Sequence, residues 1–133
     1  MGRSIHTPDA PPPAGPYSQG HAAAGLLFAA GQGPFDSAGE RVGETFEEQV
    51  DATLDNLETV AKEAGTGLDK LVRIGVFLRD PADFPVLNEV LKRRLSEPLP
   101  CRTTVPAPLT GFDVEIDAVF ELPEAGAGEV SPA

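Results

Sequence analysis

The chain is poor in the residue types that cross-link small secreted domains and that bind polyanions. Its 133 residues include one cysteine, one methionine, two histidines and no tryptophan, and ten basic side chains stand against 21 acidic ones. A single cysteine forms no internal disulfide, which is typical of a reducing compartment, so we expect a cytoplasmic protein. The formal net charge of −11 disfavours nucleic acid and anionic membranes as partners, because both are bound through basic patches.

Long apolar runs are also missing, and no run approaches the length of a membrane span. The first residues, Met1 to His6, match neither a signal peptide nor a myristoylation motif. His6 and His21 have no Cys, Asp or Glu partners at metal-ligand spacing, so no metal site is predicted. The length fits one domain, which we place at residues 1–121, and the Gly- and Pro-rich residues 122–133 are expected to form a disordered tail.

Hydrophobic periodicity and turn signals predict the order strand, strand, strand, helix, strand, helix, strand, strand. The first helix begins at the capping box Thr45-Phe-Glu-Glu48 and ends at Gly65, and the second begins at Asp80-Pro81. A proline-rich arm follows the first strand, and residues 17–22 are expected to lead into a turn. The predicted order has three strands before the first helix, but residues are assigned to only two of them. The assigned strands are 4–7, 25–30, 71–80, 102–106 and 114–121.

The predicted sheet has more apolar surface than two helices can cover. Three of its strands carry apolar residues on both faces, whereas the helices pack on one face only. Other copies of the same chain are the simplest cover for the second face, so we expect a homo-oligomer.

The last two predicted strands carry the residues with the clearest chemistry. A loop rich in Pro, Gly and Asp joins them, so a hairpin is expected to bring Arg102 and Glu115 into one neighbourhood. One interpretation is a cross-strand ion pair. The other is a site in which the guanidinium binds a ligand carboxylate and Glu115 orients or deprotonates a water. The spacing alone does not decide between the two interpretations.

Two neighbours of these residues are given structural roles. Cys101 points to the face opposite Arg102 and has no nearby histidine, so we interpret it as a small half-buried apolar residue. Asp117 shares the face of Glu115, and we interpret it as a surface or interface charge.

Seven blocks resemble, in order along the chain, the RidA/YjgF family of enamine/imine deaminases. The resemblance covers roughly residues 4–121. It implies a chorismate-mutase-like α+β fold, with a mixed sheet and two helices packed on one face. It also implies a homotrimer with three clefts between subunits, and no metal or organic cofactor. The blocks are Ala14–Gln19, Ala30–Pro34, Gln49 with Asn56-Leu57, Val72–Asp80, Asp83-Phe84 with Asn88, Pro100–Val105 and Val114–Ala118.

The resemblance also implies a reaction and a set of site residues. The reaction is hydrolysis of intermediates such as 2-aminoacrylate or 2-aminocrotonate to 2-oxo acids and ammonia. Arg102 corresponds to the arginine that holds the substrate carboxylate, and Glu115 to the acidic residue that orients the hydrolytic water. The other implied substrate-binding residues are Tyr17, Gly31, Asn88 and Thr104, the last through its backbone amide.

Two departures from the family pattern bear on activity. Ala30 stands where the best-studied branch has serine, and the loop Pro106–Phe112 is shorter than in that branch. Three alternatives stay open: endoribonuclease or translation-inhibitor activity, a non-catalytic ligand-binding or chaperone-like trimer, and a specialised deaminase of a biosynthetic pathway. The net charge of −11 argues against the first.

Overall fold

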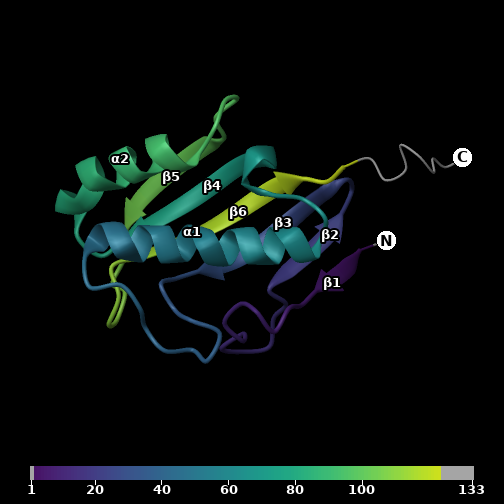
Figure 1. The fold of residues 1–133 in the computed structure, drawn as a ribbon, viewed down its shortest axis with the longest axis horizontal. Helices are drawn as coiled ribbons and strands as arrows, with labels where there is room; N and C mark the ends of the chain where they lie inside the picture. The colour runs from purple at the N-terminus through teal and green to yellow at the C-terminus, as the bar shows by residue number, and fades with distance from the viewer. Residues whose placement is uncertain (1, 124–133) are drawn as a thin grey trace, which may run out of the picture.

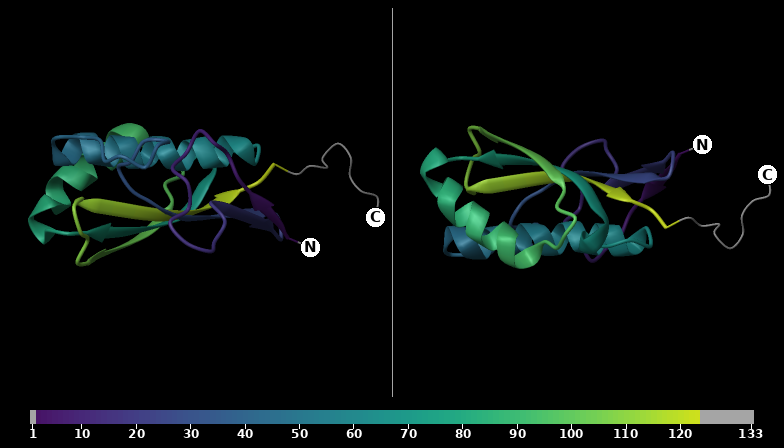
Figure 2. Two further views of the ribbon diagram at one scale, coloured as in Figure 1. Left: turned by 90° about the horizontal axis from the view of Figure 1, so that it is seen from below. Right: turned by 90° about the horizontal axis from the view of Figure 1, so that it is seen from above.

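The computed structural model describes residues 2–123, which form one mixed six-stranded sheet of order β1-β2-β3-β6-β4-β5. Both helices lie on one face of this sheet, and no helix of the described residues covers the other face (Figures 1 and 2). The predicted order of elements is confirmed. The strands are β1 (Arg3–Ile5), β2 (Gly20–Ala23), β3 (Leu26–Gln32), β4 (Leu71–Leu78), β5 (Cys101–Pro106) and β6 (Val114–Glu121), and the helices are α1 (Phe46–Glu63) and α2 (Phe84–Arg94).

The N-terminal strands differ in detail from the prediction. The strand that had no assigned residues is β2, which overlaps the segment expected to lead into a turn and pairs with both β1 and β3. At the other end, Leu122 packs against the core, and its N–H donates to the Gly25 carbonyl at 3.0 Å. The predicted tail beyond Pro123 lies outside the described residues.

Helix α1 begins and ends where the sequence indicates. Thr45 Oγ1 accepts from the Glu48 N–H, and Glu48 Oε1 accepts from the Thr45 N–H, each at 3.1 Å. Gly65 follows the helix with φ +90°, a conformation that glycine adopts without strain. The face toward the sheet is apolar, and Val50, Leu54, Leu57 and Val60 are fully buried there.

Helix α2 begins later than predicted. Asp80 accepts from the Ala82 N–H at 2.9 Å as expected of a cap, but the turn it caps is a 3-10 turn, Pro81–Asp83, and α2 starts at Phe84. Leu87 and Leu91 are buried against the core. Phe84, the first residue of α2, is 42% exposed.

Ion pairs join α2 to α1 across their solvent side. Arg94 donates to Asp51 and to Asp55, each at 2.8 Å, and Arg93 donates to Asp51 at 3.0 Å. Partial burial opposes ionisation of Asp51, but the hydrogen bonds from Arg94 and Arg93 prevail, and the pKa of Asp51 is lowered. These contacts help fix the position of α2 over the sheet.

The expected hairpin of the last two strands is wrong. Strand β5 pairs in parallel with β4, and β6 pairs antiparallel with β3 and β4, so β4 lies between β5 and β6. The chain runs from β4 through α2 to β5 as a β-α-β crossover, whose two strands are parallel. The sheet is therefore mixed, and β5 is its edge strand (Figure 1).

The face of the sheet away from the helices is partly apolar and partly charged. Phe28 and Val105 lie on it and are 45% and 39% exposed. Between them Asp117 accepts from the Gly75 N–H at 3.0 Å and lies 3.8 Å from Arg73, so its predicted role as a surface charge is confirmed in this chain. No helix among residues 2–123 is long and apolar enough to cross a membrane.

Candidate active site

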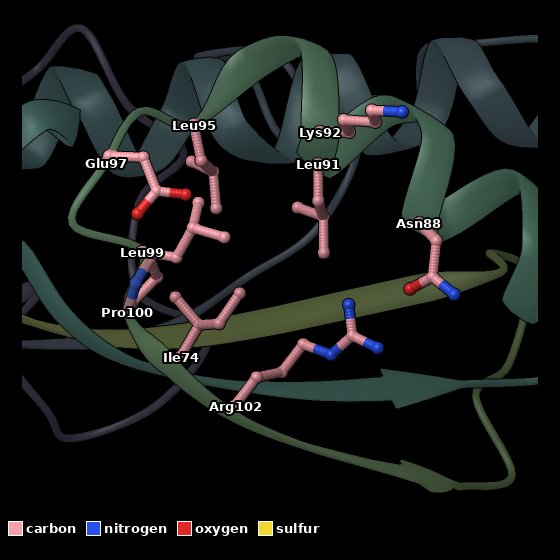
Figure 3. Close-up of a pocket in the computed structure, with 9 residues that line it drawn as sticks. All are labelled: Ile74, Asn88, Leu91, Lys92, Leu95, Glu97, Leu99, Pro100 and Arg102. Carbon is pink, nitrogen blue, oxygen red and sulfur yellow. The ribbon is translucent and has the colours of Figure 1, made fainter.

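A groove of about 460 Å³ lies between α2 and the edge strand β5. Its floor is the helix-side face of β5 and β4, because Arg102 is paired with Ile74, a core residue. Figure 3 shows the Arg102 guanidinium pointing into the groove toward Asn88 on α2. The lining residues are Ile74, Asn88, Leu91, Lys92, Leu95, Glu97, Leu99, Pro100 and Arg102.

Arg102 has no carboxylate partner among residues 2–123, and it makes no hydrogen bond with a described side chain. Its Cζ atom lies 5.3 Å from the centroid of the Phe84 ring, so the cation stacks on an exposed aromatic residue at the start of α2. The cross-strand ion pair with Glu115 is therefore not formed within one chain. The five N–H donors of the guanidinium are free to bind an anion.

Thr104 lies on the same face of β5 as Arg102, two residues further on, but it does not line the groove. Its hydroxyl oxygen is buried and has no hydrogen-bond partner among residues 2–123. A buried unsatisfied hydroxyl costs about 1–3 kcal/mol.

A second cavity, of about 380 Å³, contains Glu115 together with Tyr17 and Gly31. Glu115 is paired with Phe77 on β4, so it lies on the face of the sheet opposite Arg102. The rings of Phe35 and Phe112 also line the cavity and meet edge to face, with centroids 5.1 Å apart.

The Glu115 carboxylate lies directly against the backbone of Gly31. A Cβ atom at position 31 would collide with Glu115 Oε2, so glycine makes room for the carboxylate. The carboxylate accepts no hydrogen bond from the described residues. Burial raises the pKa of Glu115 above its ordinary value, and the nearby charge of Asp117 raises it further.

Two buried amides hold the walls of this second cavity. The Gln19 side chain accepts from the Thr7 N–H at 2.7 Å and donates to the Pro11 carbonyl at 2.9 Å, which fixes the proline-rich arm. Asn56 on α1 donates to the Gly33 and Phe35 carbonyls at 2.9 and 2.8 Å, which fixes the loop after β3. Both amides lie in blocks quoted for the family resemblance, yet neither was expected to position the site.

Tyr17 is half exposed in this cavity. Its phenolic oxygen accepts from the Ala14 N–H at 3.0 Å, which leaves the phenolic proton free to donate to a ligand. The sequence-predicted residues thus form two groups, Arg102 with Asn88 and Glu115 with Tyr17 and Gly31. Their strands are two spacings apart and the residues are offset along the strand, so Arg102 and Glu115 are on the order of 14 Å apart between Cα atoms. A small ligand cannot contact both groups in one chain.

Contacts in the described chain support neither a reactive role for Cys101 nor a metal site. Cys101 is exposed rather than half-buried, and its Sγ donates to the Val72 carbonyl at 3.5 Å on the face away from Arg102. Among residues 2–123, no three His, Cys, Asp or Glu side chains are grouped to hold a metal ion. The Asp113 carboxylate accepts hydrogen bonds from Arg79 at 2.6 Å and from Gln49 at 3.2 Å.

Comparison with known proteins decides the family. The sequence profile described as Endoribonuclease L-PSP matches residues 7–121. The chain belongs to this family, the RidA/YjgF family.

Relatives of the family match over most of their length. The RutC family protein y4sK of Sinorhizobium fredii is 43% identical over 121 residues, which are 89% of this chain and 96% of that protein. The mitochondrial protein mmf2 of Schizosaccharomyces pombe is 42% identical over 110 residues, 79% of this chain and 86% of that protein. The crystal structure of RidA from Psychrobacter sp. PAMC 21119 has a TM-score of 0.84 at 34% identity and covers 90% of this chain and 99% of its own. The α+β fold expected from the resemblance is therefore confirmed.

Proposed function

We propose that this RidA/YjgF member hydrolyses reactive enamine and imine intermediates, of the 2-aminoacrylate or 2-aminocrotonate type, to 2-oxo acids and ammonia. The observation that carries the proposal is the unpaired guanidinium of Arg102 beside the Asn88 amide. A 2-imino acid presents one strong handle, its carboxylate, and a guanidinium binds a carboxylate through two parallel hydrogen bonds.

The reaction needs little covalent help from the protein. The enamine tautomerises to the imine, water adds to its C2 carbon, and the C2–N bond of the resulting carbinolamine breaks to release ammonia. Glu115 accepts a hydrogen bond from the attacking water, takes its proton as the C–O bond forms, and returns it to the substrate nitrogen, which gives the carbinolamine. The carbinolamine hydroxyl proton then passes to that nitrogen as the C2–N bond breaks, so ammonia leaves and Glu115 ends as a carboxylate. Its raised pKa brings this carboxylate closer to the operating pH, which favours a general base. Positioning the substrate and the water supplies most of the rate enhancement.

The active unit in this proposal is a homotrimer, because the two groups of site residues lie on opposite faces of one sheet. Each cleft then takes Arg102 and Asn88 from one subunit and Glu115, Tyr17 and Gly31 from its neighbour. Two features of the described chain support an assembly: the exposed Phe28 and Val105 on the face that no helix covers, and the edge position of β5.

The names of the relatives do not agree on one activity. One solved relative is called RidA, whereas the family description and other solved relatives carry the name endoribonuclease. The net charge of −11 opposes RNA binding. A cytoplasmic location stays a prediction from the single cysteine, and the relative mmf2 is mitochondrial.

Imine generated in the reaction vessel tests the proposal. An amino-acid oxidase or a threonine dehydratase supplies the short-lived intermediate, and its disappearance is followed with and without the protein. We expect the wild type to accelerate hydrolysis over the uncatalysed rate and Arg102→Ala not to. A wild type that leaves the uncatalysed rate unchanged overturns the proposal. Salt-titrated binding of RNA to the same preparation tests the ribonuclease alternative.

A further inference from the structure

Two carboxylates lie side by side on the face of the sheet away from the helices. Glu115 and Asp117 are alternate residues of β6, so their side chains point to the same face, about 6.6 Å apart along the strand. Each carboxylate lies over a glycine. A Cβ atom at Gly31 would collide with Glu115 Oε2, and one at Gly75 would collide with Asp117 Oδ1. The two glycines therefore leave room for neighbouring acidic groups on one face.

The contacts of the two carboxylates differ. Asp117 accepts from the Gly75 N–H at 3.0 Å and lies 3.8 Å from Arg73 Nη1, and both contacts favour its charged form. Glu115 is half-buried, and burial together with the charge of Asp117 raises its pKa. The charge of Asp117 is therefore held fixed, and Glu115 is the group whose ionisation responds to it.

The other groups around Glu115 add little charge. The described residues that line its cavity with it are uncharged, the Tyr17 phenol included. Asp113 lies two residues before Glu115, but its carboxylate accepts from Arg79 and from Gln49 on α1, so it is directed toward the helix.

The neighbouring strands add no charge beside Glu115 either. Phe77 is paired with it on β4, and Val105 is paired with Phe77 on β5. In the proposed cleft, Arg102 of the neighbouring subunit brings a cation, which binds the substrate carboxylate. Asp117, with Arg73 beside it, is thus the fixed charge in the described chain that acts most strongly on Glu115.

We propose that Asp117 is a positioning residue of the proposed reaction: it acts through Glu115, and its fixed negative charge makes that carboxylate a stronger base toward the hydrolytic water. The proposal rests on the proposed deaminase function, in which Glu115 takes a proton from the water. Arg73 opposes the effect, because a cation beside Asp117 weakens the negative potential at Glu115.

Three substitutions separate the charge of Asp117 from its packing. Asp117→Asn removes the charge and keeps an oxygen that accepts from the Gly75 N–H. Arg73→Gln removes the cation paired with it. Glu121→Gln is the matched control, because Glu121 is an exposed carboxylate on the same face of β6, about 20 Å from Glu115, where salt screens its charge. Light scattering and melting of each variant check that the assembly and the fold are kept.

The pH dependence of kcat/KM for imine hydrolysis is the first measurement. The rate falls on the acid side as Glu115 gains a proton. Asp117→Asn should move this fall to lower pH and lower the plateau rate, because the carboxylate becomes a weaker base. On the steep part of the fall, the variant should keep at least about twofold more of its own plateau rate than the wild type does. Arg73→Gln should move the fall to higher pH, and Glu121→Gln should leave it in place.

A second measurement does not depend on activity. The NMR signal of the Glu115 carboxyl carbon, assigned by its absence from Glu115→Gln, follows the ionisation of this group in the assembled protein. Its titration midpoint should fall in Asp117→Asn, rise in Arg73→Gln and stay in place in Glu121→Gln. A merely structural role for Asp117 would change the plateau rate or the melting temperature and leave the midpoint unchanged.

The proposal is overturned if the midpoint of Glu115 is the same in Asp117→Asn as in the wild type, or if the midpoint moves and the pH dependence of hydrolysis does not. Failure of the proposed function gives a different result. Hydrolysis is then unaccelerated in the wild type and in every variant, whereas the midpoints of Asp117→Asn and Arg73→Gln still move in opposite directions.

Discussion

Replacing Arg102 should weaken ligand binding much more than it lowers the stability of the fold. The side chain has no ion pair among residues 2–123, and its one recorded contact is the stacking on Phe84. An exposed cation–π contact contributes about 0.5–1 kcal/mol. Arg102→Ala should therefore lower the melting temperature by no more than about 4 °C in a domain of this size.

The loss of ligand binding should be much larger. Charge-assisted hydrogen bonds contribute about 1.5–3 kcal/mol each, so removing a bidentate pair is expected to weaken binding of a 2-oxo acid by roughly tenfold to several hundredfold. Arg102→Lys should recover only part of this affinity, because an ammonium cannot reproduce the planar fork. Lys92→Ala removes the same charge from the same groove and should cost less than about threefold, since its ammonium points away from the Arg102 guanidinium (Figure 3).

The assay uses titration calorimetry for the affinity and differential scanning calorimetry for the melting temperature. Both are run on one preparation of each variant. A structural role for Arg102 predicts the opposite pattern, in which the melting temperature or the assembly mass falls first and affinity follows. An Arg102→Ala protein that binds 2-oxobutyrate as tightly as the wild type refutes the assignment.

Other expectations follow from the same site. Glu115→Gln should keep the fold and lower hydrolysis more than ligand binding. Because burial raises the pKa of Glu115, the ionised wild-type carboxylate costs stability, so the variant should melt no lower than the wild type at neutral pH. Any gain should fade as the pH falls from the raised pKa of the folded state toward 4.5, and it should be absent below 4.5. Equal turnover in the two proteins would make Glu115 a structural charge. Ala30→Ser should fold normally and raise turnover of small imines, and an unchanged or lower rate would indicate a pocket adapted to other substrates. Light scattering at micromolar concentration should give a trimer mass, and a monomer mass would contradict the proposed cleft.

The sequence predicted those parts of the fold that depend on local contacts. Helix α1 is capped and stopped by residues within one turn of its ends, so Thr45 and Gly65 could be assigned directly. Strand β6 alternates buried and open residues as expected of a strand covered on one face. These local signals do not depend on which strands and helices pack against each other.

Pairing of the last strands could not be assigned in this way. The loop between residues 106 and 114 carries turn residues, which suggested a hairpin, but strand pairing depends on contacts between distant parts of the chain. A better signal was available in the strand, helix, strand run from Leu71 to Pro106, since two strands joined by a helix are normally parallel. Recognition of that unit would have separated Arg102 from Glu115.

The candidate site was predicted through family resemblance more than through physical chemistry. Arg102 with Asn88, and Glu115 with Tyr17 and Gly31, lie together in two cavities of the described chain. The stacking of Arg102 on Phe84 was not predicted; the structure leaves the Phe84 ring 42% exposed at the first residue of α2.

The placement of Arg102 and Glu115 on opposite faces of one sheet has a genetic consequence. If each cleft draws these two residues from different subunits, two inactive alleles can complement each other. A mixed trimer of Arg102→Ala and Glu115→Gln chains contains one cleft that carries both substitutions and one that carries neither. Coexpression of the two inactive proteins should therefore restore part of the activity, whereas two alleles that both alter Arg102 should not.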